Sequence, residues 1–153
     1  MQSNTGIMRA STQETGYMGK RIAVLDDDVD VADLFAARYR KLGLIADAYH
    51  YPMDMTRFWV EAMNYDIILL DHRLGGTNGA NVAANLWKNS DVRAKVFIFT
   101  SLFHEEYRSF KYYFRKDALI EDPTLIFTVE ESIIDRAVET SVLRQMRVED
   151  AVA

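Results

Sequence analysis

Acidic and hydroxyl side chains follow three short apolar runs of this sequence, each at the point where the run ends. They are the triplet Asp26-Asp27-Asp28 after residues 22–25, Asp71 after residues 67–70, and Thr100-Ser101 after residues 96–99. Four-residue apolar runs of this kind are typical of strands that are buried on both faces of a parallel sheet. Because neighbouring parallel strands end at one edge of the sheet, we expect these side chains to converge there.

The chemistry of such a cluster is restricted by its charge. Carboxylates in close contact cannot all stay ionised unless a cation is present or their pKa values rise. Mg²⁺ is the usual ion for one or two carboxylates plus a phosphate, and it also neutralises charge during phosphoryl transfer. A carboxylate beside the ion can attack phosphorus and form an acyl phosphate. The cluster therefore predicts Mg²⁺-assisted phosphoryl transfer to a carboxylate, with a hydroxyl on the next strand donating a hydrogen bond to a phosphoryl oxygen.

Helical and strand-like segments alternate along the chain. The expected strands are residues 22–25, 44–46, 67–70, 96–99 and 125–127, and the expected helices are residues 31–42, 55–63, 82–87, 104–116 and 133–148. Asp30 is the expected N-cap of the first helix and Gly43 its expected end. Five such alternations predict an α/β fold, a doubly wound five-stranded parallel sheet of flavodoxin-like order 2-1-3-4-5.

Length and composition fit a single domain. The chain has 153 residues, of which 49% are hydrophobic and 27% charged, a profile typical of globular proteins. Residues 1–19 are polar and without periodicity, so we expect a flexible leader there, a domain over residues 20–148 and a tail over 149–153.

Charge and hydropathy exclude several classes of function. The net charge of −5 argues against a bare nucleic-acid-binding surface. The absence of cysteine excludes disulfides, thiolate metal sites and a cysteine nucleophile. No apolar run approaches the roughly 20 residues needed to cross a bilayer, and the N-terminus lacks the apolar core of a signal peptide. We therefore expect a cytoplasmic protein that contacts neither membrane nor nucleic acid directly.

Three stretches of the sequence carry a specific combination of motifs. They are RIAVLDDDVDVADLFAARYRKLG, YDIILLDHRLGGTNGANVA and KVFIFTS, which cover most of residues 20–104. An acidic pair followed by a helix, a single aspartate after a second apolar run and a threonine after a third occur in this order. With these features the sequence resembles the receiver domain of two-component response regulators.

The resemblance implies a role for each matching residue. Asp71 corresponds to the phospho-accepting aspartate, and Thr100 to the hydroxyl that follows the phosphoryl group on activation. Asp26 and Asp27 correspond to the acidic pair that holds Mg²⁺ together with Asp71, and the backbone carbonyl of Arg73 corresponds to a further metal ligand. The implied protein is a phosphorelay module and not a metabolic enzyme. It takes a phosphoryl group from a sensor histidine kinase or a phosphotransfer protein and alters a surface on its last helices.

One family feature is not found at its expected place. The family has an essential lysine at the end of the fifth strand, where the expected strand 125–127 puts Thr128. Lys116 lies before that strand, only 16 residues after Thr100, and is not expected to substitute for it. This departure favours, as an alternative, a degenerate receiver that binds proteins without being phosphorylated.

The segment from Tyr107 to Phe114 is unusually aromatic. Its rings cannot all face one core from one helix, so either some are exposed or the segment departs from a helix. Leu125 stands where the family has a switch aromatic, with Tyr112 or Tyr113 as alternatives. Exposed aromatic residues concentrate at interfaces, and the resemblance implies a partner or homodimer surface on the face formed by residues 104–148. The alternative is that these rings form a thick local core.

Other site types fit less well. A calcium loop that starts at Asp26 would need glycine where Val31 stands and glutamate where Ala37 stands. A third hypothesis is a small flavodoxin-like enzyme that hydrolyses phosphate esters with the same carboxylates. Turnover of such esters by the purified protein would support it.

Overall fold

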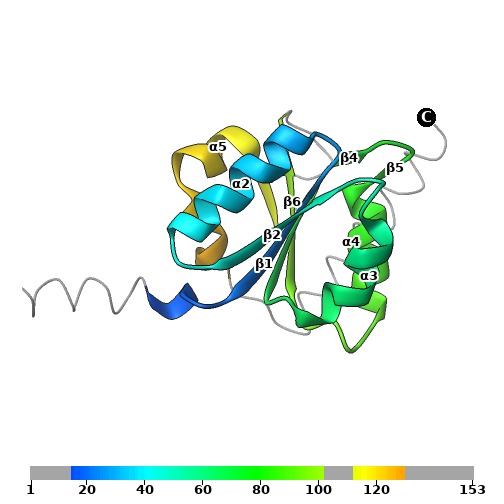
Figure 1. The fold of residues 1–153 in the computed structure, drawn as a ribbon, viewed down its shortest axis with the longest axis horizontal. Helices are drawn as coiled ribbons and strands as arrows, with labels where there is room; N and C mark the ends of the chain where they lie inside the picture. The colour runs from blue at the N-terminus through cyan, green and yellow to red at the C-terminus, as the bar shows by residue number, and fades with distance from the viewer. Residues whose placement is uncertain (1–14, 102–111, 130–153) are drawn as a thin grey trace, which may run out of the picture.

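A computed structural model describes residues 15–101 and 112–129 of the chain (Figure 1). Five strands form a parallel sheet of order β2-β1-β3-β6-β7. They are β1 (Arg21–Asp26), β2 (Ile45–His50), β3 (Ile67–Asp71), β6 (Lys95–Thr100) and β7 (Tyr113–Arg115). Numbered within this sheet alone, the order is 2-1-3-4-5, so the predicted fold class is confirmed.

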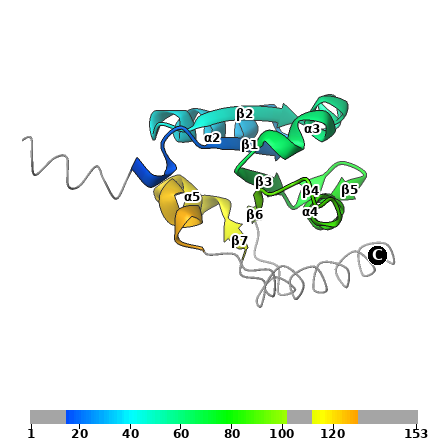
Figure 2. The same cartoon turned by 90° about the horizontal axis from the view of Figure 1, so that it is seen from below.

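Helices cover both faces of the sheet. Figure 1 shows α2 (Val29–Lys41) and α5 (Lys116–Glu121) on one face, and α3 (Met55–Glu61) and α4 (Gly79–Lys88) on the other. Short 3₁₀ helices are η1 (Thr15–Tyr17), η2 (Ala62–Asn64) and η4 (Pro123–Thr128), and β4 (Arg73–Leu74) pairs with β5 (Thr77–Asn78) in a separate antiparallel hairpin (Figure 2). None of the helices within the described ranges has the length and apolar character needed to cross a membrane.

The central strands are buried as the apolar runs predict. Every residue of β3 is buried, and β1 and β6 are buried apart from their first residue. Side chains on both faces of such strands contact helices, and this explains why the runs are continuously apolar and do not alternate. The ends of β1, β3 and β6 are therefore fixed by the most rigidly packed part of the molecule.

The N-cap of the first helix lies two residues earlier than predicted. Asp28, and not Asp30, is the N-cap of α2, and its side chain accepts hydrogen bonds from the backbone N–H groups of Asp30 and Val31. Gly43 follows the helix with a φ of 99°, a left-handed conformation that favours glycine, so its predicted role at the helix end is confirmed.

The fifth strand lies earlier in the chain than the sequence pattern predicts. Residues 125–127 belong to η4, whereas residues 113–115, predicted as the end of a helix, form β7. A three-residue apolar run can be buried equally well by a strand or by a 3₁₀ turn, so periodicity does not separate the two. Residues 104–111 of the predicted helix at 104–116, and the whole predicted helix at 133–148, lie outside the described residues.

Aromatic contacts attach η4 to the rest of the fold. Phe127 stacks on Tyr17 of η1 with ring centroids 4.2 Å apart, and it meets the ring of Tyr39 on α2 edge-on at 6.4 Å. The Tyr39 hydroxyl donates to the carbonyl of Pro123 at 3.0 Å. Thus Tyr17, from the segment predicted to be a leader, contacts the domain directly.

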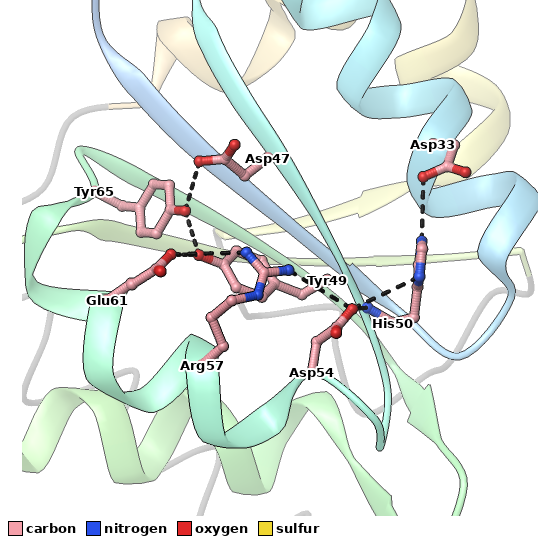
Figure 3. A network of polar contacts seen from close by, with 8 residues as sticks. All are labelled: Asp33, Asp47, Tyr49, His50, Asp54, Arg57, Glu61 and Tyr65. Carbon is pink, nitrogen blue, oxygen red and sulfur yellow. Dashed lines mark hydrogen bonds and ion pairs between the residues drawn. The ribbon is translucent and has the colours of Figure 1, made fainter.

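A polar network fastens α3 to the edge strand β2 (Figure 3). The hydroxyl of Tyr49 contacts the Glu61 carboxylate and the Tyr65 hydroxyl, and Tyr65 donates to Asp47 at 2.7 Å. The Arg57 guanidinium lies over the Tyr49 ring, 4.3 Å from its centroid. Burial, with the bond to Glu61 next, raises the pKa of Tyr49 to about 12. Tyr49 therefore remains a neutral hydrogen-bond donor near pH 7.

Candidate functional site

The ends of three adjacent strands bring the predicted residues together. Asp26 ends β1, Asp71 ends β3 and Thr100 ends β6, and all three are buried. Asp27 is exposed beside them. Carboxylate oxygens of Asp26, Asp27 and Asp71 lie within 4.8 Å of one another, so the trio could hold a metal ion.

Backbone contacts fix the Asp26 carboxylate. The side chain is fully buried, and its Oδ1 accepts a hydrogen bond from the backbone N–H of Asp28 at 2.9 Å. Asp28 in turn caps α2, so the turn between β1 and α2 orients both residues. The three residues of the acidic triplet thus have different positions. Asp26 points into the site, Asp28 caps α2, and Asp27 is exposed at the surface.

A lysine completes the site, contrary to the expectation from the sequence. Lys116 Nζ lies 2.9 Å from Asp26 Oδ2 and 3.1 Å from Asp71 Oδ1. The prediction that the fifth strand lacks its lysine, with Thr128 in that place, is therefore wrong. Its cause is the misplaced strand: Thr128 lies in η4, and Lys116 directly follows β7.

Strand pairing explains how Lys116 reaches the carboxylates. Arg115 pairs in register with Thr100 at the end of β6, so Lys116 is the first residue beyond the sheet edge. The sequence signal that could have located it is the short aromatic run Tyr112-Tyr113-Phe114, since aromatic residues are enriched in strands. Tyr113, not Leu125, lies on the strand that precedes the lysine.

Burial and charge oppose each other within the site. Burial raises the pKa of Asp26 to about 7; the Asp71 charge adds to this rise, while the Asp28 N–H and Lys116 oppose it. Burial also raises the pKa of Asp71, against the charge of Lys116. For Lys116, burial by itself lowers the pKa, but the hydrogen bonds and charges of both aspartates raise it overall. Thus Lys116 stays cationic, and Asp26 is only partly ionised near neutral pH.

The loop after β3 is built around a close backbone approach. Gly79, the first residue of α4, donates its N–H to the carbonyl of His72 at 2.9 Å. A Cβ on Gly79 would lie 2.5 Å from the carbonyl oxygen of Asp71. Asn78 is the N-cap of α4, and its side chain accepts a hydrogen bond from the Asn81 N–H at 2.8 Å.

The remaining candidate residue lies in the hairpin that follows β3. Arg73 is exposed on β4, two residues after Asp71, in the hairpin that leads to α4. A histidine lies beside the acidic turn: His50 pairs in register with Asp26, and its Nε2 lies 3.1 Å from Asp33 Oδ1.

Solved structures with this fold are receiver domains of response regulators. The response regulator TrrA of Thermotoga maritima, solved with Mg²⁺ and BeF, is 26% identical with a TM-score of 0.55, over 70% of this chain and 98% of its own. In the complex of TrrA with the histidine kinase ThkA, the matched chain is 26% identical with a TM-score of 0.54, over 70% and 97%. The receiver domain of the Francisella response regulator 1452 is 20% identical with a TM-score of 0.57, over 72% and 98%.

No family model and no curated protein sequence matches the chain. The structural similarity to receiver domains therefore stands on the fold and on the arrangement of the strands, and it confirms the resemblance that the sequence motifs indicate.

Replacing Gly79 with alanine should disturb the site through the backbone. Because the added Cβ would meet the Asp71 carbonyl at 2.5 Å, the loop must shift, and we expect Gly79→Ala to lower the free energy of unfolding by about 2 kcal/mol. Urea unfolding measures this. Gly75→Ala is the control, because no atom lies within 4 Å of the Cβ it would add. Equal stability of the two variants would contradict the close approach.

Mg²⁺ affinity should depend on pH through Asp26. The ion needs an ionised carboxylate. Because the pKa of Asp26 is about 7, this residue carries a proton at lower pH, and the proton must leave when the ion binds. We expect the affinity to rise about ten-fold per pH unit up to about pH 7 and then to level off, with up to one proton released on binding.

Calorimetric titration with Mg²⁺ in buffers of different ionisation enthalpy measures both quantities. Asp30→Asn, at an exposed position in the first turn of α2, is the matched control and should keep the same pH profile. An affinity that does not change between pH 5 and 7, with no proton release, would contradict the raised pKa of Asp26.

Proposed function

We propose that this chain is a signalling receiver that accepts a phosphoryl group from a phosphohistidine donor onto Asp71, with Mg²⁺ bound beside it. The observation that carries the proposal is the contact of one buried ammonium, Lys116, with both Asp26 and Asp71. Positive charge at this point suits a phosphoryl group in transfer. The likeness to TrrA, which has been solved with Mg²⁺ and BeF and with a histidine kinase, supports it.

Asp71 is the nucleophile in this proposal. One of its carboxylate oxygens bonds to phosphorus while the phosphorus–nitrogen bond of the donor breaks. The leaving nitrogen keeps the bonding electron pair, and a proton on the other ring nitrogen lets the donor depart as neutral imidazole. Burial restricts the approach of water to the reacting oxygen, since Asp71 is almost completely covered. The product is an acyl phosphate on Asp71, which the chain hydrolyses without any other enzyme.

Residues around Asp71 stabilise the added charge. Asp26, Asp27, Asp71 and the backbone carbonyl of Arg73 are the proposed ligands of Mg²⁺. When bound, the ion supplies positive charge that neutralises the phosphoryl oxygens. Lys116 pairs with one of these oxygens, and the Thr100 hydroxyl donates to another.

The consequence of phosphorylation is a shift between two conformations of the domain. Thr100 and Tyr113 lie on the paired strands β6 and β7, so a movement of Thr100 can reach β7. We propose that the receiver unit spans residues 20–148 of a cytoplasmic protein. Residues 104–111 and 130–148 of the proposed dimer face lie outside the described residues.

The two alternative functions, a degenerate receiver and a hydrolase, differ in how well the structure supports them. The degenerate receiver rested on a missing lysine, and Lys116 removes that premise. The hydrolase hypothesis predicts turnover of external phosphate esters, which the same purified protein can be used to test.

Phosphorylation should occur on Asp71 alone. We expect incubation with acetyl phosphate and Mg²⁺ to add one phosphoryl group to the intact chain, seen by mass spectrometry, and Asp71→Asn to abolish the addition because the nucleophile is lost. Asp30→Asn is the control and should be modified as fast as the wild type. A wild-type chain that gains no mass, or an Asp71→Asn chain that still does, would refute the proposal. Repeated turnover of a phosphate ester would favour the hydrolase.

An exposed apolar surface beside the site offers a place for a donor protein. Val29 and Leu34 on α2 and Ile120 on α5 are exposed, and Arg38 of α2 donates to the Ile120 carbonyl, which joins the two helices. Val29 is the first residue of α2 after the acidic turn, and α5 starts at Lys116. Both helices therefore begin next to residues of the site, and the exposed acidic residues Asp27 and Asp28 directly precede α2.

A charge on that surface should slow transfer from a protein donor and spare transfer from a small one. We expect Leu34→Asp, at a side chain 48% exposed, to slow transfer from phosphorylated phosphotransfer domains about ten-fold, the loss typical of an interface anchor. Transfer from acetyl phosphate should stay unchanged. Val60→Asp, on α3 and 69% exposed, is the matched control. Equal slowing by both variants, or none by Leu34→Asp, would place the donor elsewhere.

A further inference from the structure

The ammonium of Lys116 has a third neighbour besides the two carboxylates. Its Nζ lies 4.9 Å from the centroid of the Phe99 ring, within the distance of about 6 Å at which a cation is attracted to an aromatic face. The Lys116 side chain is only 13% exposed, and Phe99 is fully buried. Since water screens such a contact little, it is stronger here than at a surface.

We propose that Phe99 is a positioning residue that holds the Lys116 ammonium in the site through a cation–π interaction, a role that rests on the proposed function. The ring itself has a fixed orientation. Phe35 of α2 packs against it edge-to-face, with centroids 5.0 Å apart and planes 84° apart. Phe99 also pairs in register with Asp71 on one side and Phe114 on the other.

Local structure around Lys116 does little to restrict its side chain. Lys116 is the first residue of α5, and its N-cap, Arg115, makes no side-chain capping hydrogen bond. Arg115 instead pairs with Asp117 at 3.1 Å, and both of those side chains are exposed. A lysine has four rotatable side-chain bonds, so its ammonium needs partners within the site to stay there.

The two carboxylate partners change during the proposed reaction, whereas the ring does not. Metal binding engages Asp26, and phosphorylation turns Asp71 from a carboxylate into an acyl phosphate. In each of these states the face of Phe99 still offers the same negative potential to the ammonium. Phe99 therefore keeps Lys116 within reach of the phosphoryl oxygens while its ionic partners are exchanged.

Fluorination separates this role from simple packing, because it weakens the ring's attraction for a cation and changes its volume little. We would incorporate phenylalanines with one, two and three ring fluorines at position 99 of the full chain. With Mg²⁺ present, we expect the affinity for BeF₃⁻, a mimic of the phosphoryl group, to fall stepwise to about one tenth of the wild-type value. Phe97 is the matched control: it lies on the same strand and face and is fully buried, and its ring contacts are Tyr112 and Phe114.

A second measurement does not depend on metal or phosphoryl mimic. Nuclear magnetic resonance at constant pH gives the solvent-exchange rate of the Lys116 ammonium protons in the metal-free chain, and we expect this rate to rise with each added fluorine at position 99. If wild type binds no BeF₃⁻, the proposed function fails, and the exchange rates still decide the role of Phe99. The positioning role is refuted if wild type binds BeF₃⁻ but neither the affinity nor the exchange rate changes with the number of fluorines at position 99. It is also refuted if fluorines at position 97 change both quantities equally.

Discussion

The structure depends on the contact of Lys116 with two buried carboxylates at the ends of neighbouring strands. Asp26 and Asp71 could not both ionise in this packed site without a counter-charge. Together with Asp27, three carboxylates and one ammonium leave two negative charges, the complement of one divalent cation. The lysine therefore stabilises the folded chain and also sets how much charge the site has left to offer.

The rest of the fold serves to keep these groups at fixed positions. Strands buried on both faces hold the ends of β1, β3 and β6, while the backbone contact at Gly79 fixes the loop that follows Asp71. The lysine has a different support, since it stands at the start of a six-residue helix after a three-residue strand. The acidic residues of the site thus stand at the ends of rigid, buried strands, whereas the lysine stands between two short elements. This arrangement suits a domain that changes between two conformations.

The sequence predicts the acidic half well and the basic half poorly. Asp26, Asp71 and Thr100 follow runs of four apolar residues, whose burial on both faces leaves a clear pattern. Tyr113–Arg115 is a strand of three residues at the sheet edge, too short to show a period, and the apolar run at 125–127 imitates a strand while packing as η4. The clustered carboxylates already suggest raised pKa values, but burial as the main cause of the rise at Asp26 could not be predicted, because burial follows from tertiary packing.

The stacking of Tyr17 on Phe127 has a mechanical consequence. It joins residues that are 110 positions apart, and Phe127 also meets Tyr39 on α2. Tension applied to the chain ahead of Thr15 would therefore load η4, the 3₁₀ helix that follows α5, as well as β1, which starts only at Arg21. A pull at that end of the chain would therefore act on the amino-terminal edge of β1 and, through η4, on α5, whose first residue is Lys116.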